Sequence, residues 1–506
     1  MAPPLDDLAL SPAGYTHKQI LRVIFGILLC ILLAALDQTV VIPAVPAIAG
    51  DLQAYGHLSW IVTAYLLTST AATPLYGKLS DIYGRRALLI PALVLFIIAS
   101  MLCGFSQTLP QLIGARALQG LGGAGLMAMA QAAVADVVAP RERGRYQGYM
   151  ASMWGVASIG GPIVGGYVTD HLTWRWLFWA NLPIGLVAIY LCDRALRTIP
   201  VQRRPAQIDW AGAALLVGSV TSCLLALSWG GIEFPWGSPI VLGVAGLSAL
   251  LLGALIWNER RAPDPILPPR LFGDAVFLRG VLVASISSLG LFGATFLLPL
   301  YFQLILGVDA SSSGLLVVPF LAATVVGAFS SGQVARRLGR TRMILIVALS
   351  LGTVGMAVLA LLGPLWVVLV ASFVMGTGIG ATMPTVLMTV QNAASQRDVG
   401  VATGSLLFLR SMGGAFGSTM VGTVLALSFN AGLAAMGIRA AVDLGALRGS
   451  GGLGGVTIDQ ARAALAPGFT WGFGLCALLM AGAVVIALGM RDQVLRSNVT
   501  PTPPAH

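Results

Sequence analysis

The sequence predicts an all-α protein that crosses a lipid bilayer many times, and three observations support this fold class. Of its 506 residues, 57% are hydrophobic and only 9% are charged, whereas a soluble globular protein carries about 25% charged residues. The mean hydropathy is +0.87. Apolar runs of about 20 residues, the length that crosses the hydrocarbon core, recur along the chain. A soluble fold would leave these runs without a polar surface, so we set it aside.

Each apolar run is predicted to form one membrane-spanning helix. Tryptophans such as Trp60, Trp174 and Trp257 stand near the ends of several runs, as expected for indole rings at a membrane interface. The runs predict fourteen transmembrane helices, at 20–42, 58–76, 87–105, 109–133, 147–169, 174–192, 211–228, 239–257, 280–302, 314–333, 343–362, 365–389, 402–427 and 469–489.

The basic residues predict the orientation of these helices. Because cytoplasmic loops are enriched in lysine and arginine, most of the 29 basic residues fall on one side if the N-terminus is cytoplasmic. The outer side then holds only Arg175, Arg439, Arg448 and Arg462. Both termini are therefore predicted to be cytoplasmic. The basic residues are spread over short loops between apolar runs, which argues against nucleic acid as a partner.

A repeated loop predicts that the chain contains two related halves. Gly77 is followed seven residues later by Gly84 and then by Arg85 and Arg86, and Gly332 and Gly339 repeat this spacing. We expect both loops to form tight turns between helices, and duplicated halves are common in secondary transporters. The predicted organisation is a tail at 1–19, a six-helix bundle at 20–192, a linker with two inserted helices at 193–279, a second six-helix bundle at 280–490 and a tail at 491–506, with a long outer loop at 428–467.

In these motifs the chain resembles the major facilitator superfamily, in its fourteen-helix drug:proton antiporter branch (EmrB/QacA-like). The loop at 77–86 is similar to the signature loop of the superfamily, and Arg116 to Gly120 is similar to the motif associated with proton transfer. Leu36 to Val41 is similar to the first-helix motif of the branch. The resemblance implies the superfamily fold and transport by alternating access. The antiporter motif would comprise Gly148, Gly161, Pro162, Gly165 and Gly166.

Asp37 is the only acidic residue placed well inside a predicted span. A charge there is costly, at least about 2.5–3.5 kcal/mol, so its presence calls for a partner or a function. A carboxyl group in apolar surroundings can bind and release a proton near neutral pH. Arg116 and Gln119 are its expected partners, and the three residues are the predicted proton-coupling group. A purely structural role for Asp37, or a fixed ion pair with Arg116, is the alternative.

Two further groups of residues have predicted conformational roles. Gly77, Asp81, Gly84, Arg85 and Arg86 would form a cytoplasmic gate, in which Asp81 faces the positive end of a helix dipole; a solvated loop is the alternative. The glycines of the antiporter motif would allow close helix packing, and Pro162 would bend its helix.

Arg410 and Trp154 are the candidate substrate contacts. Arg410 lies inside the span 402–427, so it either contacts substrate or pairs with a polar group on a neighbouring helix. No acidic residue falls inside the last six predicted spans, which argues against divalent organic cations and leaves neutral or anionic substrates open.

We find no sequence signal for a cofactor, a metal site or an enzyme. A GxGxxG match at 120–125 lies in an apolar run with no preceding strand, so it does not indicate a dinucleotide site. The predicted function is proton-coupled export of small amphipathic compounds across the bacterial cytoplasmic membrane. The predicted partners are the substrate, protons and the bilayer, and the outer loop is long enough to contact a periplasmic adaptor. The alternatives are a transporter of one metabolite, siderophore or lipid and, more distantly, a membrane protein that does not transport.

Overall fold

The structure is a computed structural model that describes residues 17–53, 58, 60–197, 208–231, 233–395, 398–436 and 458–495. Within these residues the regular structure is helical, apart from two isolated bridges, Gly230 to Phe234 and Arg340 to Val494. Most of both predicted tails, residues 198–207 of the predicted linker and residues 437–457 of the predicted outer loop lie outside the described residues.

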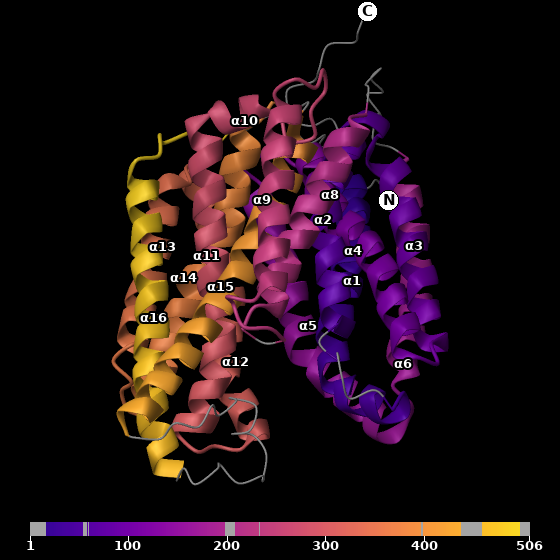
Figure 1. Cartoon of the computed structure of the whole chain (residues 1–506). Coiled ribbons are helices and arrows are strands. Elements are labelled where there is room, and N and C mark those ends of the chain that lie inside the picture. The colour runs from indigo at the N-terminus through magenta and orange to yellow at the C-terminus, as the bar shows by residue number, and fades with distance from the viewer. Residues whose placement is uncertain are drawn as a thin grey trace, which may run out of the picture.

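The first part of the chain forms helices that pack together on one side of the molecule (Figure 1). They are α1 (His17–Asp51), α2 (Trp60–Tyr83), α3 (Arg85–Phe105), α4 (Leu109–Val137), α5 (Arg143–His171), α6 (Arg175–Trp179) and α7 (Asn181–Leu196).

The last part forms a second group on the other side (Figure 1). Its helices are α10 (Pro269–Gly273), α11 (Ala275–Leu300), the π-helix η2 (Tyr301–Ile305), α12 (Ala310–Leu338), α13 (Arg342–Leu359), α14 (Leu365–Ala393), α15 (Val399–Ala435) and α16 (Ile458–Leu488). The ends of the predicted outer loop 428–467 are therefore helical, because α15 extends to Ala435 and α16 begins at Ile458.

The packing of the first group recurs in the second. Helix α1 packs on α5 and α7, and α11 packs on α15 and α16. Helix α4 packs on α2 and α3, and α14 packs on α12 and α13. The two groups contact each other mainly at two places: α2 packs on α15, and α5 packs on α12. This repeated set of neighbours matches the repeated loop motif of the sequence.

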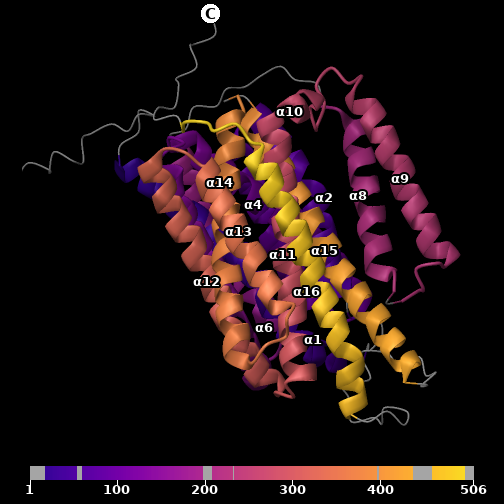
Figure 2. The same ribbon diagram turned by 90° about the vertical axis from the view of Figure 1, so that its left-hand side faces the viewer.

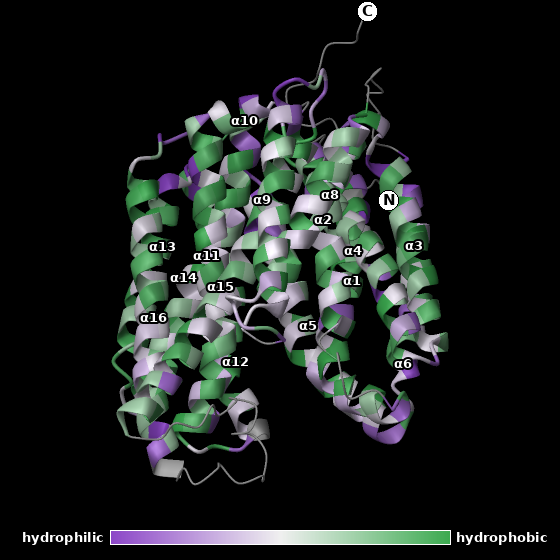
Figure 3. Ribbon diagram, in the orientation of Figure 1, coloured by the Kyte–Doolittle hydropathy of each residue, from purple (hydrophilic) through white to green (hydrophobic). Residues whose placement is uncertain are grey.

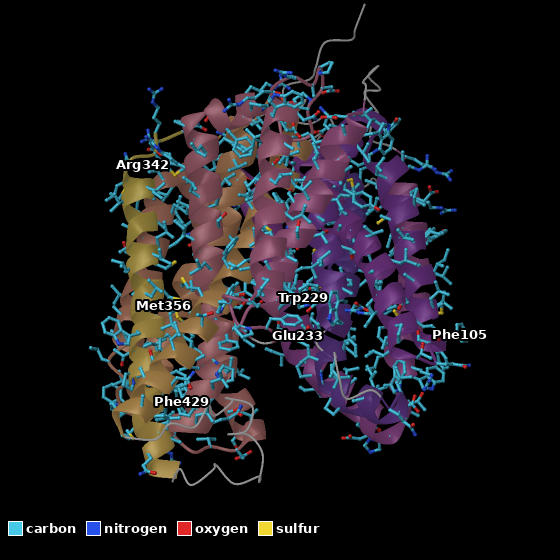
Figure 4. The ribbon with its side chains drawn as sticks, in the orientation of Figure 1. Phe105, Trp229, Glu233, Arg342, Met356 and Phe429 are labelled. Atoms are coloured by element: carbon cyan, nitrogen blue, oxygen red, sulfur yellow. The ribbon has the colours of Figure 1, made fainter. Side chains whose placement is uncertain are left out.

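Helices α8 (Trp210–Trp229) and α9 (Pro239–Glu259) stand apart from both groups as a pair (Figure 2). They pack mainly on each other, and α8 also touches α2 and α15. Trp229 and Glu233 lie at the turn between the two helices (Figure 4). Leu216 and Val220 of α8 bury their side chains against Leu67 and Ala71 of α2.

The prediction of fourteen membrane-spanning helices is wrong: in the described part of the chain, twelve helices are long and apolar enough to cross a membrane. The predicted spans 58–76 and 147–169 are not among them. They correspond to α2 and α5, which are long enough at 24 and 29 residues but too polar. Both helices form the contact between the two groups, and their hydroxyl, glycine and charged residues lower the hydropathy of the segment.

The surface is that of a protein embedded in a membrane. Apolar residues cover the outer faces of the helices, and hydrophilic residues gather toward the two ends (Figure 3). Arg342 marks the end where α10 lies, and Phe429 lies toward the opposite end (Figure 4). Because Arg85, Arg141 and Arg336 also lie at helix ends on the Arg342 side, we call this the predicted cytoplasmic end.

The predicted loop 77–86 is mostly helical. Helix α2 continues to Tyr83, so Gly77 and Asp81 lie within it, and only Gly84 separates α2 from α3. Gly84 has φ of 90° and Gly339 has φ of 65°, a backbone conformation that favours glycine. Only the second glycine of each repeat therefore forms the expected tight turn.

Candidate functional site

Asp37 lies in a buried polar cluster between α1, α4 and α7. Its side chain is buried, with 3% of the residue exposed. One carboxylate oxygen accepts a hydrogen bond from Arg116 at 2.6 Å, and the other accepts from Gln119 at 2.8 Å and Asn181 at 3.1 Å. A buried charge needs such compensation. The structure therefore brings all three predicted proton-coupling residues together.

Arg116 is held by more than Asp37. Its Nε donates to the carbonyl oxygen of Ile61 at 3.0 Å, and its guanidinium donates to the side-chain oxygen of Gln119 at 2.7 Å. The guanidinium also lies over the ring of Tyr65, 4.5 Å from the centroid, within the range of a cation–π contact. These partners orient the arginine toward α1 from the third turn of α4.

Asn181 is not among the site residues predicted from the sequence. Helix α6 ends at Trp179 and α7 begins at Asn181, so the break between them sets the amide beside Asp37. The Asn181 side chain also donates to the hydroxyl of Ser100 at 2.9 Å. A polar residue within the predicted span 174–192 was the available signal, but only the packing of α7 on α1 shows its partner.

The glycines of α5 face two different helices. A side chain at Gly161 would meet Thr39 of α1, and a Cβ at Gly165 would lie 2.5 Å from the carbonyl oxygen of Val40. A Cβ at Gly148 would lie 2.6 Å from the ring of Phe329 on α12. Pro162 lies inside α5. Gly166 has no neighbour within 4 Å of its Cβ position, so it takes no part in this packing.

Asp81 connects the two groups of helices at the predicted cytoplasmic end. Its carboxylate accepts hydrogen bonds from the backbone of Gly400 at 3.0 Å and Val401 at 2.8 Å, in the first turn of α15. A carboxylate is favourable there because the N-terminus of a helix carries partial positive charge. Arg85 pairs with the same carboxylate at 2.7 Å and with Asp136 of α4 at 2.8 Å. Arg86 instead pairs with Asp193, within the first group.

Backbones of the two groups also approach closely at this end. A Cβ at Gly77 would lie 2.6 Å from the carbonyl oxygen of Gly400, and a side chain at Gly332 of α12 would strike the carbonyl of Gly144 on α5. Gln391 of α14 donates to Thr403 at 3.0 Å and to the carbonyl oxygen of Gln131 on α4 at 3.4 Å. The two groups are therefore in close contact at the predicted cytoplasmic end.

The two candidate substrate contacts lie apart from the Asp37 cluster. Arg410 is in α15 and is partly exposed, and Trp154 is in α5 and is exposed. Within the described residues Arg410 forms no hydrogen bond, ion pair or ring contact. One of the two roles predicted for Arg410 was pairing with a polar group on a neighbouring helix. The described residues contain no such partner.

Two repeated groups of helices, one of which holds a buried ionisable pair, are typical of a secondary transporter. The sequence profile of the Major Facilitator Superfamily matches residues 27–418, and the chain belongs to this family. No finding assigns it to the fourteen-helix branch.

Relatives and solved structures agree with this family. The chain is 37% identical to the multidrug transporter protein MdtP of Bacillus subtilis over 83% of this chain and 77% of that protein. It is 36% identical to an uncharacterized MFS-type transporter of Mycobacterium tuberculosis, matching 79% of this chain but only 58% of that protein. The structure of the proton:xylose symporter XylE aligns with a TM-score of 0.62 and 15% identity, covering 93% of this chain and 95% of that one, which shows the shared fold.

Proposed function

We propose that this protein is a proton-coupled exporter of small amphipathic compounds. The observation that carries the proposal is the buried cluster in which Asp37 is neutralised by Arg116 and held by Gln119 and Asn181. An ionisable pair inside a membrane-embedded bundle marks a proton or ion pathway. The name of the Bacillus relative, a multidrug transporter, supports export of drug-like compounds.

Protonation of Asp37 would couple to helix movement through the charge of Arg116. A proton on Asp37 removes the negative partner of a buried guanidinium, and breaking such a pair costs about 3–5 kcal/mol. The cluster then gains stability by moving α1 relative to α4, so that Arg116 reaches water or other acceptors. Proton binding and helix position are thereby linked.

A path of direct contacts leads from α1 to the second group of helices. The Thr39 hydroxyl, two residues after Asp37, donates to the carbonyl oxygen of Ala157 on α5 at 2.8 Å. Helix α5 in turn contacts Phe329 of α12 at Gly148. Movement of α1 would therefore be passed to the interface between the groups, where Asp81 and the glycine contacts would open and close the predicted cytoplasmic gate.

We infer that the protein works in a bacterial cytoplasmic membrane. It is a multi-pass membrane protein by its apolar helices, and relatives occur in Mycobacterium and Bacillus. The basic loops predict which end faces the cytoplasm.

Transport into proteoliposomes tests the proposal. We expect wild-type protein to accumulate a fluorescent amphiphile against its gradient when a pH difference is imposed, and to stop when the difference is collapsed. Asp37→Asn should lose uphill accumulation by at least about tenfold, because an amide cannot carry the proton.

Asp51→Asn is the matched control on the same helix. Asp51 pairs with Arg175 at 2.7 Å near the other end of α1 and is largely solvent-accessible, so uphill transport should persist in this variant. Uphill transport by Asp37→Asn at the wild-type rate would refute the proton-coupling role.

A further inference from the structure

We propose that Arg410 binds the anionic group of the substrate, and that the transported compounds are therefore amphipathic anions bearing a carboxylate, sulfonate or similar group. This inference rests on the proposed transport function and adds the substrate class to it.

The depth of Arg410 suits a central binding site. It follows Val399, the first residue of α15, by eleven residues, which is about 16 Å along a helix. The hydrocarbon core is about 30 Å thick, so the guanidinium belongs near the bilayer midplane. Substrate sites of secondary transporters lie at this depth.

The neighbours of α15 show which side Arg410 occupies. The Leu409 carbonyl accepts a hydrogen bond from Ser285 of α11, and Phe408 belongs to the apolar cluster with α2 and α8. Thr403, two turns before Arg410 on the same face, binds Gln391 of α14, which reaches Gln131 of α4. This face of α15 therefore points toward the interior where the two groups of helices meet. Arg410 lies deeper in the molecule than the close contacts at the predicted cytoplasmic end, because it follows the first residue of α15 by eleven residues.

No acidic side chain among the described residues pairs with Arg410. Asp37 is paired with Arg116 and also accepts hydrogen bonds from Gln119 and Asn181. Helices α11 to α16 contain one acidic residue, Asp459, in the first turn of α16. A lone cation in this environment is costly, and an anionic ligand would remove that cost by charge-assisted hydrogen bonds.

An aromatic side chain stands beside this position. The Phe292 ring of α11 would lie 2.7 Å from a Cβ at Gly414, which is one turn beyond Arg410 on the same side of α15, and the ring is 46% exposed. A guanidinium one helical turn away from an accessible ring suits a ligand with an anionic group on an apolar body.

Equilibrium binding to the full chain in nanodiscs tests the inference without a proton gradient. The probes are three dansyl compounds that share a fluorophore: dansylglycine, which is an anion, its uncharged amide, and dansylcadaverine, which is a cation. Empty nanodiscs give the background. The measured quantity is the ratio of the dissociation constants for the amide and the anion.

We expect wild-type protein to bind the anion about tenfold or more tightly than the amide, and the cation most weakly. Arg410→Gln should bring the ratio near one, whereas Arg410→Lys should retain a preference for the anion. Arg337→Gln is the matched control, because it removes an exposed arginine of α12 at the predicted cytoplasmic end and should leave the ratio at the wild-type value.

A wild-type ratio near one, tighter binding of the cation, no binding of any of the three probes, or an unchanged ratio in Arg410→Gln would each overturn the inference. The wild-type ratio by itself tests whether the protein prefers the anion, even if Arg410→Gln does not fold. Loss of proton-driven transport with an intact anion preference would instead refute the proposed coupling and leave the substrate class standing.

Discussion

At the scale of single residues, the most informative feature is how completely Asp37 is satisfied. Three donors from two helices approach its two oxygens, and the Asn181 amide is shared with Ser100. Hydrogen bonds to the charged form of a carboxylate favour that form. These donors compensate the buried carboxylate, so the loss of any one of them should impair proton-driven transport.

Asn181→Ala removes one donor to the Asp37 carboxylate. The cluster loses one hydrogen bond to a charged group, which contributes about 1.5–3 kcal/mol at most, so proton-driven transport should fall severalfold. Uphill accumulation in proteoliposomes under a fixed pH difference measures the loss. The control is Asn258→Ala. Asn258 lies near the end of α9, and its amide donates to Asp209, which caps the start of α8. Uphill accumulation by Asn181→Ala at the wild-type rate would contradict this view of the cluster.

At the scale of helices, α5 serves as the contact between α1 and the second group. Gly161 and Gly165 bring its backbone onto α1 at Thr39 and Val40, next to Asp37, while Gly148 faces α12. Close backbone approach through small residues is a common means of packing membrane helices. The same helix therefore touches the proton-coupling cluster and the other half of the molecule.

Gly165→Val should disrupt this packing, because the new side chain would press on the Val40 carbonyl. Overpacking of this kind costs about 1–3 kcal/mol. We expect a lower melting temperature in detergent and a severalfold loss of transport. Gly166→Val is the adjacent control, since its Cβ position is open. Equal melting temperatures and transport rates in the two variants would show that the α1–α5 contact is unimportant.

At the scale of the whole molecule, the structure is closed at the predicted cytoplasmic end. Asp81 and Gly77 of α2 meet Gly400 of α15, and Gly144 of α5 meets Gly332 of α12. These pairs occupy equivalent positions in the repeated packing. The ribbons of the two groups approach at this end and diverge toward the other (Figure 1).

Asp81→Asn should weaken this closure. A carboxylate at a helix N-terminus contributes about 0.3–2 kcal/mol, so the population open at the predicted cytoplasmic end should rise about two- to thirtyfold. Spin labels at Tyr83 and Arg337, exposed residues of the two groups, report the change as a longer distance in electron–electron double resonance.

The control for this variant is Asp193→Asn. Asp193 pairs with Arg86 and Arg197 inside the first group, so its loss should not change the distance between the labels. An identical distance distribution for Asp81→Asn and wild type would argue against the gate.

The sequence by itself determined the class of protein and the chemical members of the site. Low charge and long apolar runs need no tertiary information, because membrane insertion depends on the composition of each segment. Asp37 and Arg116 were likewise visible, since charges in apolar runs are rare and costly.

Only the tertiary structure decided which groups meet. The partnership of Asn181 with Asp37, the approach of Gly77 to Gly400 and the lack of a partner for Arg410 among the described residues depend on helices far apart in the chain. The number of apolar spans also differed from the prediction, because α2 and α5 carry polar residues and form the interface between the two groups. The composition of a segment determines whether it can lie in the membrane. Which helices it contacts depends on the packing of segments that are far apart in the sequence.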